Sequence, residues 1–136
     1  MWTDDLVTIR LAGVPKGKGR PRFSRKSGRA YTPEATRSYE GALRYAAQEV
    51  MGNRKPLDGP LAVSIIARFP IPSSWSKKKK EEALYAVCKP DADNLAKVLD
   101  ALNEVVFKDD KQVAQLMMTK IYDEAPSLEI KIRGLE

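Results

Sequence analysis

The chain of 136 residues contains no histidine and a single cysteine, Cys88. Without histidine, the protein cannot use Ser-His-Asp, Cys-His or histidine-based acid–base catalysis. A zinc site of Cys and His ligands cannot be built within one chain, and neither can a disulfide. An enzyme of this composition must work with carboxylates, lysine, tyrosine, water or a metal ion held by oxygen ligands.

Long apolar runs and a signal-peptide pattern are also missing. No segment approaches the ~20 apolar residues of a membrane span. Asp4 and Asp5 stand where a signal peptide would be positively charged. The chain has no Walker A spacing, so no nucleotide cofactor is expected. We expect a cytoplasmic protein without a membrane partner, and the single cysteine favours a reducing compartment.

The apolar pattern predicts one α+β domain over residues 1–136, with a mixed sheet and helices packed on one face. Alternation predicts strands at 6–12, 61–69, 112–123 and 127–133. Helical periodicity predicts helices at 32–51, after Ser76, and at about 92–106. Thr32 is the expected N-cap of the 32–51 helix, and Pro33 its first residue. The expected buried face of the 32–51 helix consists of Tyr39, Leu43, Ala46, Ala47 and Val50. That of the helix at about 92–106 consists of Leu95, Val98, Leu99, Leu102, Val105 and Val106.

The net charge of +6 is concentrated in one part of the chain. Residues 14–31 form a basic arm with seven cations and no acid, in which we expect a short hairpin around Phe23 and Tyr31 with its turn at Ser27-Gly28. Residues 91–110 hold six acids against two lysines. A basic protein with one acidic cluster suits an enzyme that binds phosphates and holds a divalent cation.

The acidic cluster carries the strongest chemical signal. Asp91 and Asp93 lie at the start of the predicted third helix, and Lys97 follows Asp93 by one turn on the same face. Asp109 and Asp110 follow that helix, where the chain can turn back toward its start. Converging carboxylates favour Mg²⁺, with Mn²⁺ as a substitute. The alternative is that Asp91 caps the helix and the other acids are solvated helix-end and turn charges.

The basic arm is the second signal. Its glycines allow close backbone approach to phosphate, and Phe23 and Tyr31 could stack on exposed bases. The alternative is a solvated loop. The residues that we expect to contact DNA are Lys16, Lys18, Arg20, Arg22, Phe23, Arg25, Lys26 and Arg29.

Three segments together resemble the RusA-type Holliday junction endodeoxyribonucleases of bacteria and phages: KPDADNLAK at 89–97, DALN at 100–103 and DDKQV at 109–113. The run KGRPRF at 18–23 is similar to a segment found in part of that family. The segments occur in the family's order and close to its spacing, and the chain length fits one family domain.

The resemblance implies a Mg²⁺-dependent homodimer that acts in the recombination and repair of DNA and resolves four-way junctions by paired phosphodiester hydrolysis. It implies that Asp91, Asp93 and Asp110 are the essential carboxylates, with Asp109 as an adjacent metal-ligand candidate. Lys97 matches the functional lysine, and Asn94 matches a motif position that could orient the site. The host would be a bacterium or a phage-infected cell.

Two other functions remain open at this level. A non-catalytic junction-binding or architectural protein would share the basic arm, but it would not need clustered acids. A nuclease specific for flaps or forks would carry the same motifs, so the sequence does not separate it from a junction resolvase.

Overall fold

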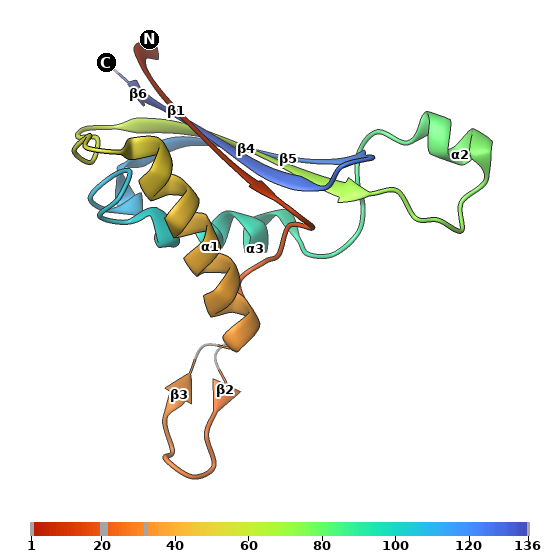
Figure 1. Cartoon of the computed structure of the whole chain (residues 1–136), viewed down its shortest axis with the longest axis horizontal. Coiled ribbons are helices and arrows are strands. Elements are labelled where there is room, and N and C mark those ends of the chain that lie inside the picture. The colour runs from red at the N-terminus through yellow and green to blue at the C-terminus, as the bar shows by residue number, and fades with distance from the viewer. Residues whose placement is uncertain (1, 20–21, 32, 136) are drawn as a thin grey trace.

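Four strands form one mixed sheet in the order β1-β6-β4-β5 (Figure 1). They are β1 (Trp2–Ala12), β4 (Leu61–Pro70), β5 (Val113–Asp123) and β6 (Ser127–Leu135). β4 and β5 run parallel, whereas β6 pairs antiparallel with both β1 and β4. The computed structural model describes residues 2–19, 22–31 and 33–135. The predicted α+β class and mixed sheet are confirmed, and the first strand starts earlier than expected.

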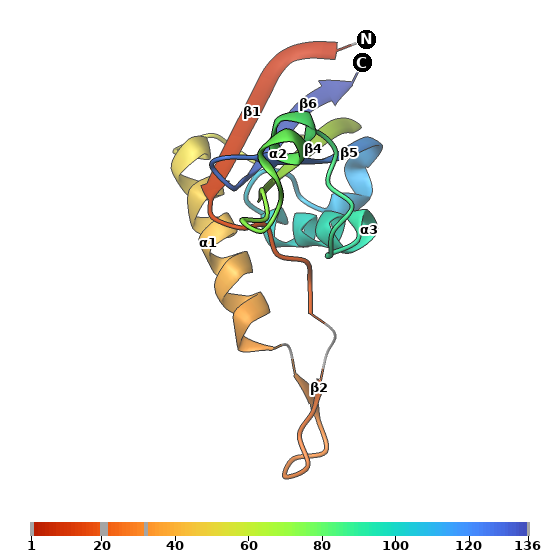
Figure 2. The same cartoon turned by 90° about the vertical axis from the view of Figure 1, so that its right-hand side faces the viewer.

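One face of the sheet carries the core. Alternate residues of β4 and β6 point into it and are buried, as period-two patterning predicts. Three elements cover this face, namely α1 (Glu34–Met51), α3 (Ala92–Ala96) and the 3₁₀ helix η1 (Lys97–Leu102) (Figures 1 and 2). Burying each Leu, Ile or Val side chain completely stabilises the fold by about 1.5–3 kcal/mol.

The α1 helix follows its predicted span with two corrections. Pro33 has an extended backbone and precedes the helix, so Glu34 is the first helical residue. Thr32, the predicted N-cap, lies outside the described residues. Val50 was expected in the core but is 42% exposed, whereas Met51 is 3% exposed. Leu43, Ala47 and Met51 follow one another at intervals of four, and this row rather than Val50 faces the sheet.

The predicted helix over 92–106 is wrong in length. The α-helix ends at Ala96, and the tighter η1 continues to Leu102. Glu104 then adopts a φ of 68°, and the chain bends so that Phe107 enters the core with no exposed surface. The predicted apolar stripe is nevertheless buried, from Leu95 through Val106. Tertiary burial of the stripe therefore prevails over regular helical geometry.

A short hairpin is confirmed in the basic arm. β2 (Arg22–Phe23) pairs antiparallel with β3 (Ala30–Tyr31). Gly28 in its turn has a φ of 68° and donates its N–H to the Ser24 carbonyl at 2.8 Å. Such a backbone conformation favours glycine. The hairpin extends beyond the N-terminal end of α1, away from the sheet (Figures 1 and 2).

The short helix α2 (Lys77–Glu82) lies beyond the end of the sheet at which β4 ends (Figure 1). Ser76 caps it, as predicted, because its hydroxyl accepts the Lys79 N–H at 3.2 Å. Across residues 2–19, 22–31 and 33–135, no helix is long and apolar enough to cross a membrane.

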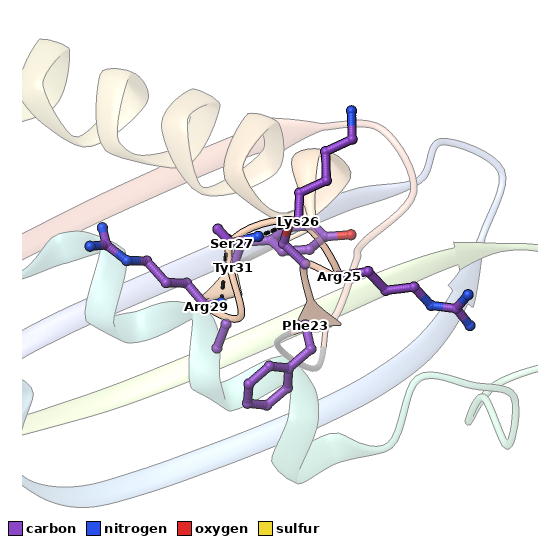
Figure 3. A pocket seen from close by; sticks show the side chains of 8 residues that line it. Phe23, Arg25, Lys26, Ser27, Arg29 and Tyr31 are labelled. Atoms are coloured by element: carbon purple, nitrogen blue, oxygen red, sulfur yellow. Dashed lines mark hydrogen bonds between the residues drawn. The ribbon is translucent and has the colours of Figure 1, made fainter.

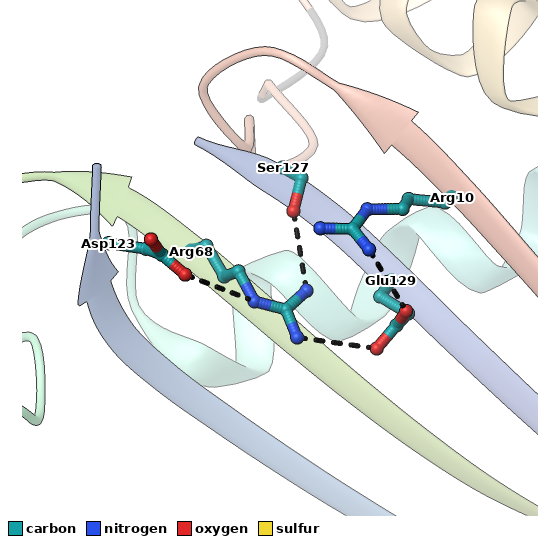
Figure 4. A network of polar contacts seen from close by, with 5 residues as sticks. All are labelled: Arg10, Arg68, Asp123, Ser127 and Glu129. Carbon is teal, nitrogen blue, oxygen red and sulfur yellow. Dashed lines mark hydrogen bonds and ion pairs between the residues drawn. The ribbon is translucent and has the colours of Figure 1, made fainter. Parts of the chain in front are cut away.

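The other face of the sheet carries a polar network that includes all four strands (Figure 4). Arg68 of β4 donates to the Ser127 hydroxyl at 3.3 Å and to Glu129 at 3.4 Å, and it lies 3.6 Å from the Asp123 carboxylate. Arg10 of β1 lies 3.7 Å from Glu129. The Arg68 side chain is 16% exposed and the Arg10 side chain 58%. Arg68 therefore connects three strands from a position largely shielded from water.

We expect Arg68→Ala to lower the free energy of unfolding by about 1–3 kcal/mol, because several charge-assisted hydrogen bonds are lost. Arg10→Ala is the matched control and should cost less than about 1 kcal/mol, as exposed ion pairs do. Urea unfolding of both variants measures the difference. Equal losses would contradict a central role for Arg68.

Candidate active site

Asp93, Lys97 and Asp110 line one shallow pocket of about 330 Å³. Asp93 lies in the first turn of α3, Lys97 is the first residue of η1, and Asp110 begins the second 3₁₀ helix, η2 (Asp110–Gln112). The pocket is completed by Ala96, Leu99, Val113 and Leu116. The structure thus brings together three of the four predicted catalytic residues on a partly apolar floor.

The two adjacent aspartates have different roles. The Asp109 carboxylate accepts the Lys111 N–H at 2.8 Å and caps η2. This backbone hydrogen bond holds the pKa of Asp109 below its usual value. Asp110, in contrast, lines the pocket. Asp109 is therefore a capping residue beside the pocket, and Asp110 is the carboxylate that faces it.

Gln112 holds this turn in place. Its side-chain oxygen accepts the N–H groups of Lys108 and Asp109 at 2.9 and 3.1 Å. Its side-chain nitrogen donates to the carbonyls of Leu57 and Gly59 at 2.9 and 3.0 Å. The amide thus fastens the acidic turn to the loop before β4. The sequence motif includes Gln112, but its local pattern does not reveal these distant partners.

Asp91 is not among the residues that line this pocket. Asp91 occupies the N-cap position of α3, but its exposed side chain makes no capping hydrogen bond. Only its backbone carbonyl takes part, accepting the Leu95 N–H at 3.0 Å. Among the described residues, no three acidic or cysteine side chains form a group that could hold a metal ion. The four predicted metal ligands therefore do not form one preassembled cluster.

The surroundings of Asp110 disfavour its ionised form. Burial raises the pKa of Asp110, and the hydrogen bond that its protonated carboxyl donates to Asp109 and the charges of Asp109 and Asp100 raise it further. Asp93 adds a second carboxylate to the same pocket. Mg²⁺ is commonly held by one or two carboxylates together with water and substrate phosphates. Two carboxylates in an open pocket fit that donor set.

Lys18 is paired with acids of its own chain. Its ammonium group lies 2.5 Å from Asp100 and 3.8 Å from Glu40. The hydrogen bond to Asp100 raises the pKa of Lys18, and burial raises that of Glu40. Lys18 thus links the basic arm to α1 and η1 through these ion pairs, and its contact with DNA stays a prediction. Sequence reasoning missed Asp100 and Glu40 as partners, since 82 positions separate Lys18 from Asp100.

The base of the basic arm packs on the site helices. A Cβ on Gly17 would lie 2.5 Å from the Asn94 side-chain nitrogen, so only glycine allows this approach. The Lys18 N–H donates to the Asn94 carbonyl at 3.4 Å, and the Gly19 N–H donates to the Thr36 hydroxyl at 2.9 Å. Asn94 therefore connects the arm to α3.

The rest of the predicted DNA-contacting set is exposed where it is described. Lys16 is exposed next to the packed base of the arm. Phe23, Arg25, Lys26 and Arg29 are exposed on the hairpin and line a concave surface there (Figure 3). Arg20 lies outside the described residues, and Arg22 is described only by its backbone, in β2.

Comparison with known proteins agrees with this arrangement. The family model Endodeoxyribonuclease RusA matches residues 12–133. The chain belongs to the RusA endodeoxyribonuclease family. It is also 36% identical over 138 residues to the uncharacterized protein YqaN of Bacillus subtilis (strain 168), with 95% of this chain and 96% of YqaN covered.

The RusA match contains both the basic arm and the acidic pocket. It also confirms the resemblance seen in the three motif segments.

We expect Gln112→Glu to lower the free energy of unfolding by about 1–3 kcal/mol, because two carbonyls lose their donor and face a carboxylate. Gln115→Glu adds the same charge at an exposed position of β5 and is the matched control. Urea unfolding of both variants is the measurement. A loss of the same size in both would assign the effect to charge alone.

Asp110→Asn should stabilise the protein at neutral pH. The raised pKa means that ionising Asp110 costs more in the folded than in the unfolded state, and asparagine removes this cost. The gain should disappear below the unfolded-state pKa of about 3.9, where aspartate is protonated in both states. Urea unfolding across this pH range tests the sign, with exposed Glu49→Gln of α1 as the control. A destabilised variant at neutral pH would contradict the repulsion.

Proposed function

We propose that this protein is a Mg²⁺-dependent endodeoxyribonuclease that resolves four-way DNA junctions by paired phosphodiester hydrolysis. Mn²⁺ would substitute for Mg²⁺. The observation that carries the proposal is the pocket in which Asp93, Lys97 and Asp110 meet, on a chain whose basic arm packs against the same helices. Membership of the RusA family supports the endonuclease class.

Asp93 and Asp110 would hold the metal ion, with Asp91 as a further ligand and Asp109 supporting the turn. A bound Mg²⁺ supplies activation of water and neutralisation of charge at the scissile phosphate. Asp110 would attract the ion because its own ionisation is unfavourable without one. Gln112 keeps Asp110 in position through the turn.

Lys97 would act on the phosphate. Its side chain is exposed and lines the pocket with both carboxylates. A protonated amine at this place neutralises negative charge that grows on the phosphate oxygens during attack. In the reaction, the oxygen of water bonds to phosphorus and one ester bond breaks, which leaves a phosphate end and a hydroxyl end.

Paired cleavage of a four-way junction would require two active pockets. Each chain carries one pocket of this kind, and a four-way junction has two-fold symmetry. A homodimer with two-fold symmetry would place one pocket on each of two equivalent strands. DNA would be the only polyanionic partner, and the cytoplasm would be the location.

The test is cleavage of an end-labelled synthetic four-way junction beside a linear duplex of the same sequence, with and without Mg²⁺. We expect paired nicks that need Mg²⁺ and occur only on the junction. Intact strands with tight binding would favour the architectural protein. Cleavage of flaps or forks in preference to junctions would favour the other nuclease.

Asp93→Asn should lower cleavage at least about a hundredfold, since even indirect metal partners cost ten- to a hundredfold. Junction binding should remain, because the substitution removes a negative charge that repels phosphate. A gel-shift assay without metal measures binding, and single-turnover cleavage measures the rate. Glu49→Gln is the control of equal charge change. Cleavage by Asp93→Asn at the wild-type rate would remove Asp93 from the metal site.

A further inference from the structure

The hairpin of residues 22–31 carries an unshielded aromatic ring. Phe23 is 75% exposed, and its cross-strand partner is Ala30, whose methyl group covers little of it. Large exposed aromatics on a basic surface are typical of platforms on which nucleic-acid bases stack. Two paired positions form no core of their own. Phe23 therefore does not stabilise the hairpin by burial and is available to a ligand.

The positive charges around this ring favour a polyanionic ligand. Arg25, Lys26 and Arg29 surround the turn, and the described part of the arm contains no acid (Figure 3). None of these three side chains has an ion pair within the part of the chain that the structure describes. Lys18, in contrast, is neutralised by Asp100 and Glu40. The cations at the tip of the arm are thus unpaired among the described residues, whereas Lys18 at its base is paired.

The base of the arm, residues 17–19, is anchored beside the acidic pocket. Its base is held by Gly17 against Asn94, by the Lys18–Asp100 ion pair and by the Gly19–Thr36 hydrogen bond. Asn94 and Asp100 belong to the same α3–η1 segment that carries Asp93 and Lys97. The base of the arm, which precedes the hairpin in the chain, is thus joined to the segment that carries the pocket residues.

We propose that Phe23 stacks on a base at the branch point of the DNA and that this contact provides the preference for junctions over linear duplex. The inference rests on the proposed function. In a linear duplex every base is already stacked, and unstacking one step costs a few kcal/mol. At a branch point the continuous stack is interrupted, so a base is available at a lower cost. The cations around the turn bind phosphates of either substrate without discrimination.

The experiment measures binding of the full chain without divalent metal, so that no strand is cut. A four-way junction and a linear duplex carry 2-aminopurine at the same sequence position, which is the branch point in the junction. We expect wild-type protein to raise 2-aminopurine fluorescence in the junction only. Phe23→Ala should abolish this rise and weaken junction binding roughly five- to a hundredfold, the range measured for loss of one base stack.

The controls separate stacking from other effects. Phe23→Ala should change duplex affinity less than about twofold, because phosphate contacts dominate there. Phe23→Trp should keep the fluorescence rise and the affinity. Tyr45→Ala removes an aromatic that is 64% exposed on α1 and should change neither. With Mg²⁺, Phe23→Ala should also spread the cuts over several positions around the branch.

Two results would overturn the inference. Equal weakening of junction and duplex by Phe23→Ala would mean that the hairpin lies in a groove as a β-ribbon. An unchanged fluorescence rise in that variant would mean that another residue contacts the base. Failure of the proposed nuclease is distinguishable from both, because it would appear as wild-type protein that raises the fluorescence but leaves the junction uncut with Mg²⁺.

Discussion

Burial of one apolar stripe organises both the fold and the site. Leu95, Val98, Leu99 and Leu102 are held against the core face of the sheet, each with at most 5% of its surface exposed. Each fully buried side chain contributes about 1.5–3 kcal/mol, which is enough to impose the 3₁₀ winding after Ala96. With this stripe inward, Asp93 and Lys97 must face outward from the same segment. The pocket is the outer side of a core element.

A second constraint brings the other carboxylate to that place. Asp110 belongs to a turn whose conformation depends on the four hydrogen bonds of Gln112 and on the Asp109 cap. These contacts offset the burial and the charge repulsion that raise the pKa of Asp110. The folded chain thus holds negative charges close together that would move apart in the unfolded chain. Such stored repulsion is useful to a site that binds a cation.

The opposite charge is divided within the basic arm. Lys18 at the base is used inside the protein to join the arm to Asp100 and Glu40, whereas the hairpin cations face solvent. An arm attached in this way presents its charge and its aromatic ring at one end of the molecule, while the pocket stays open beside α3. Attachment of the arm and exposure of its charge are therefore carried out by different residues of one basic segment.

Much of this was predictable from local sequence. Period-two and period-3.6 patterns indicated the strands, α1 and the buried stripe, and turn chemistry at Ser27-Gly28 indicated the hairpin. The motif segments placed Asp93, Lys97 and Asp110 in one chemical unit and matched the family. These features depend on residues a few positions apart, where backbone geometry alone decides which side chains share a face.

Only the tertiary structure showed that Asp109 caps η2 while Asp110 lines the pocket. It also paired Lys18 with Asp100 and gave the Gln112 side chain its hydrogen-bond partners at Leu57 and Gly59. It also ended α3 at Ala96 and exposed Val50 in place of Met51. Each of these depends on which distant segments pack together, since hydrogen bonds and ion pairs form with whatever group the fold brings near. By itself the sequence determined which residues could do chemistry, and the packing of the sheet against its helices decided which of them meet.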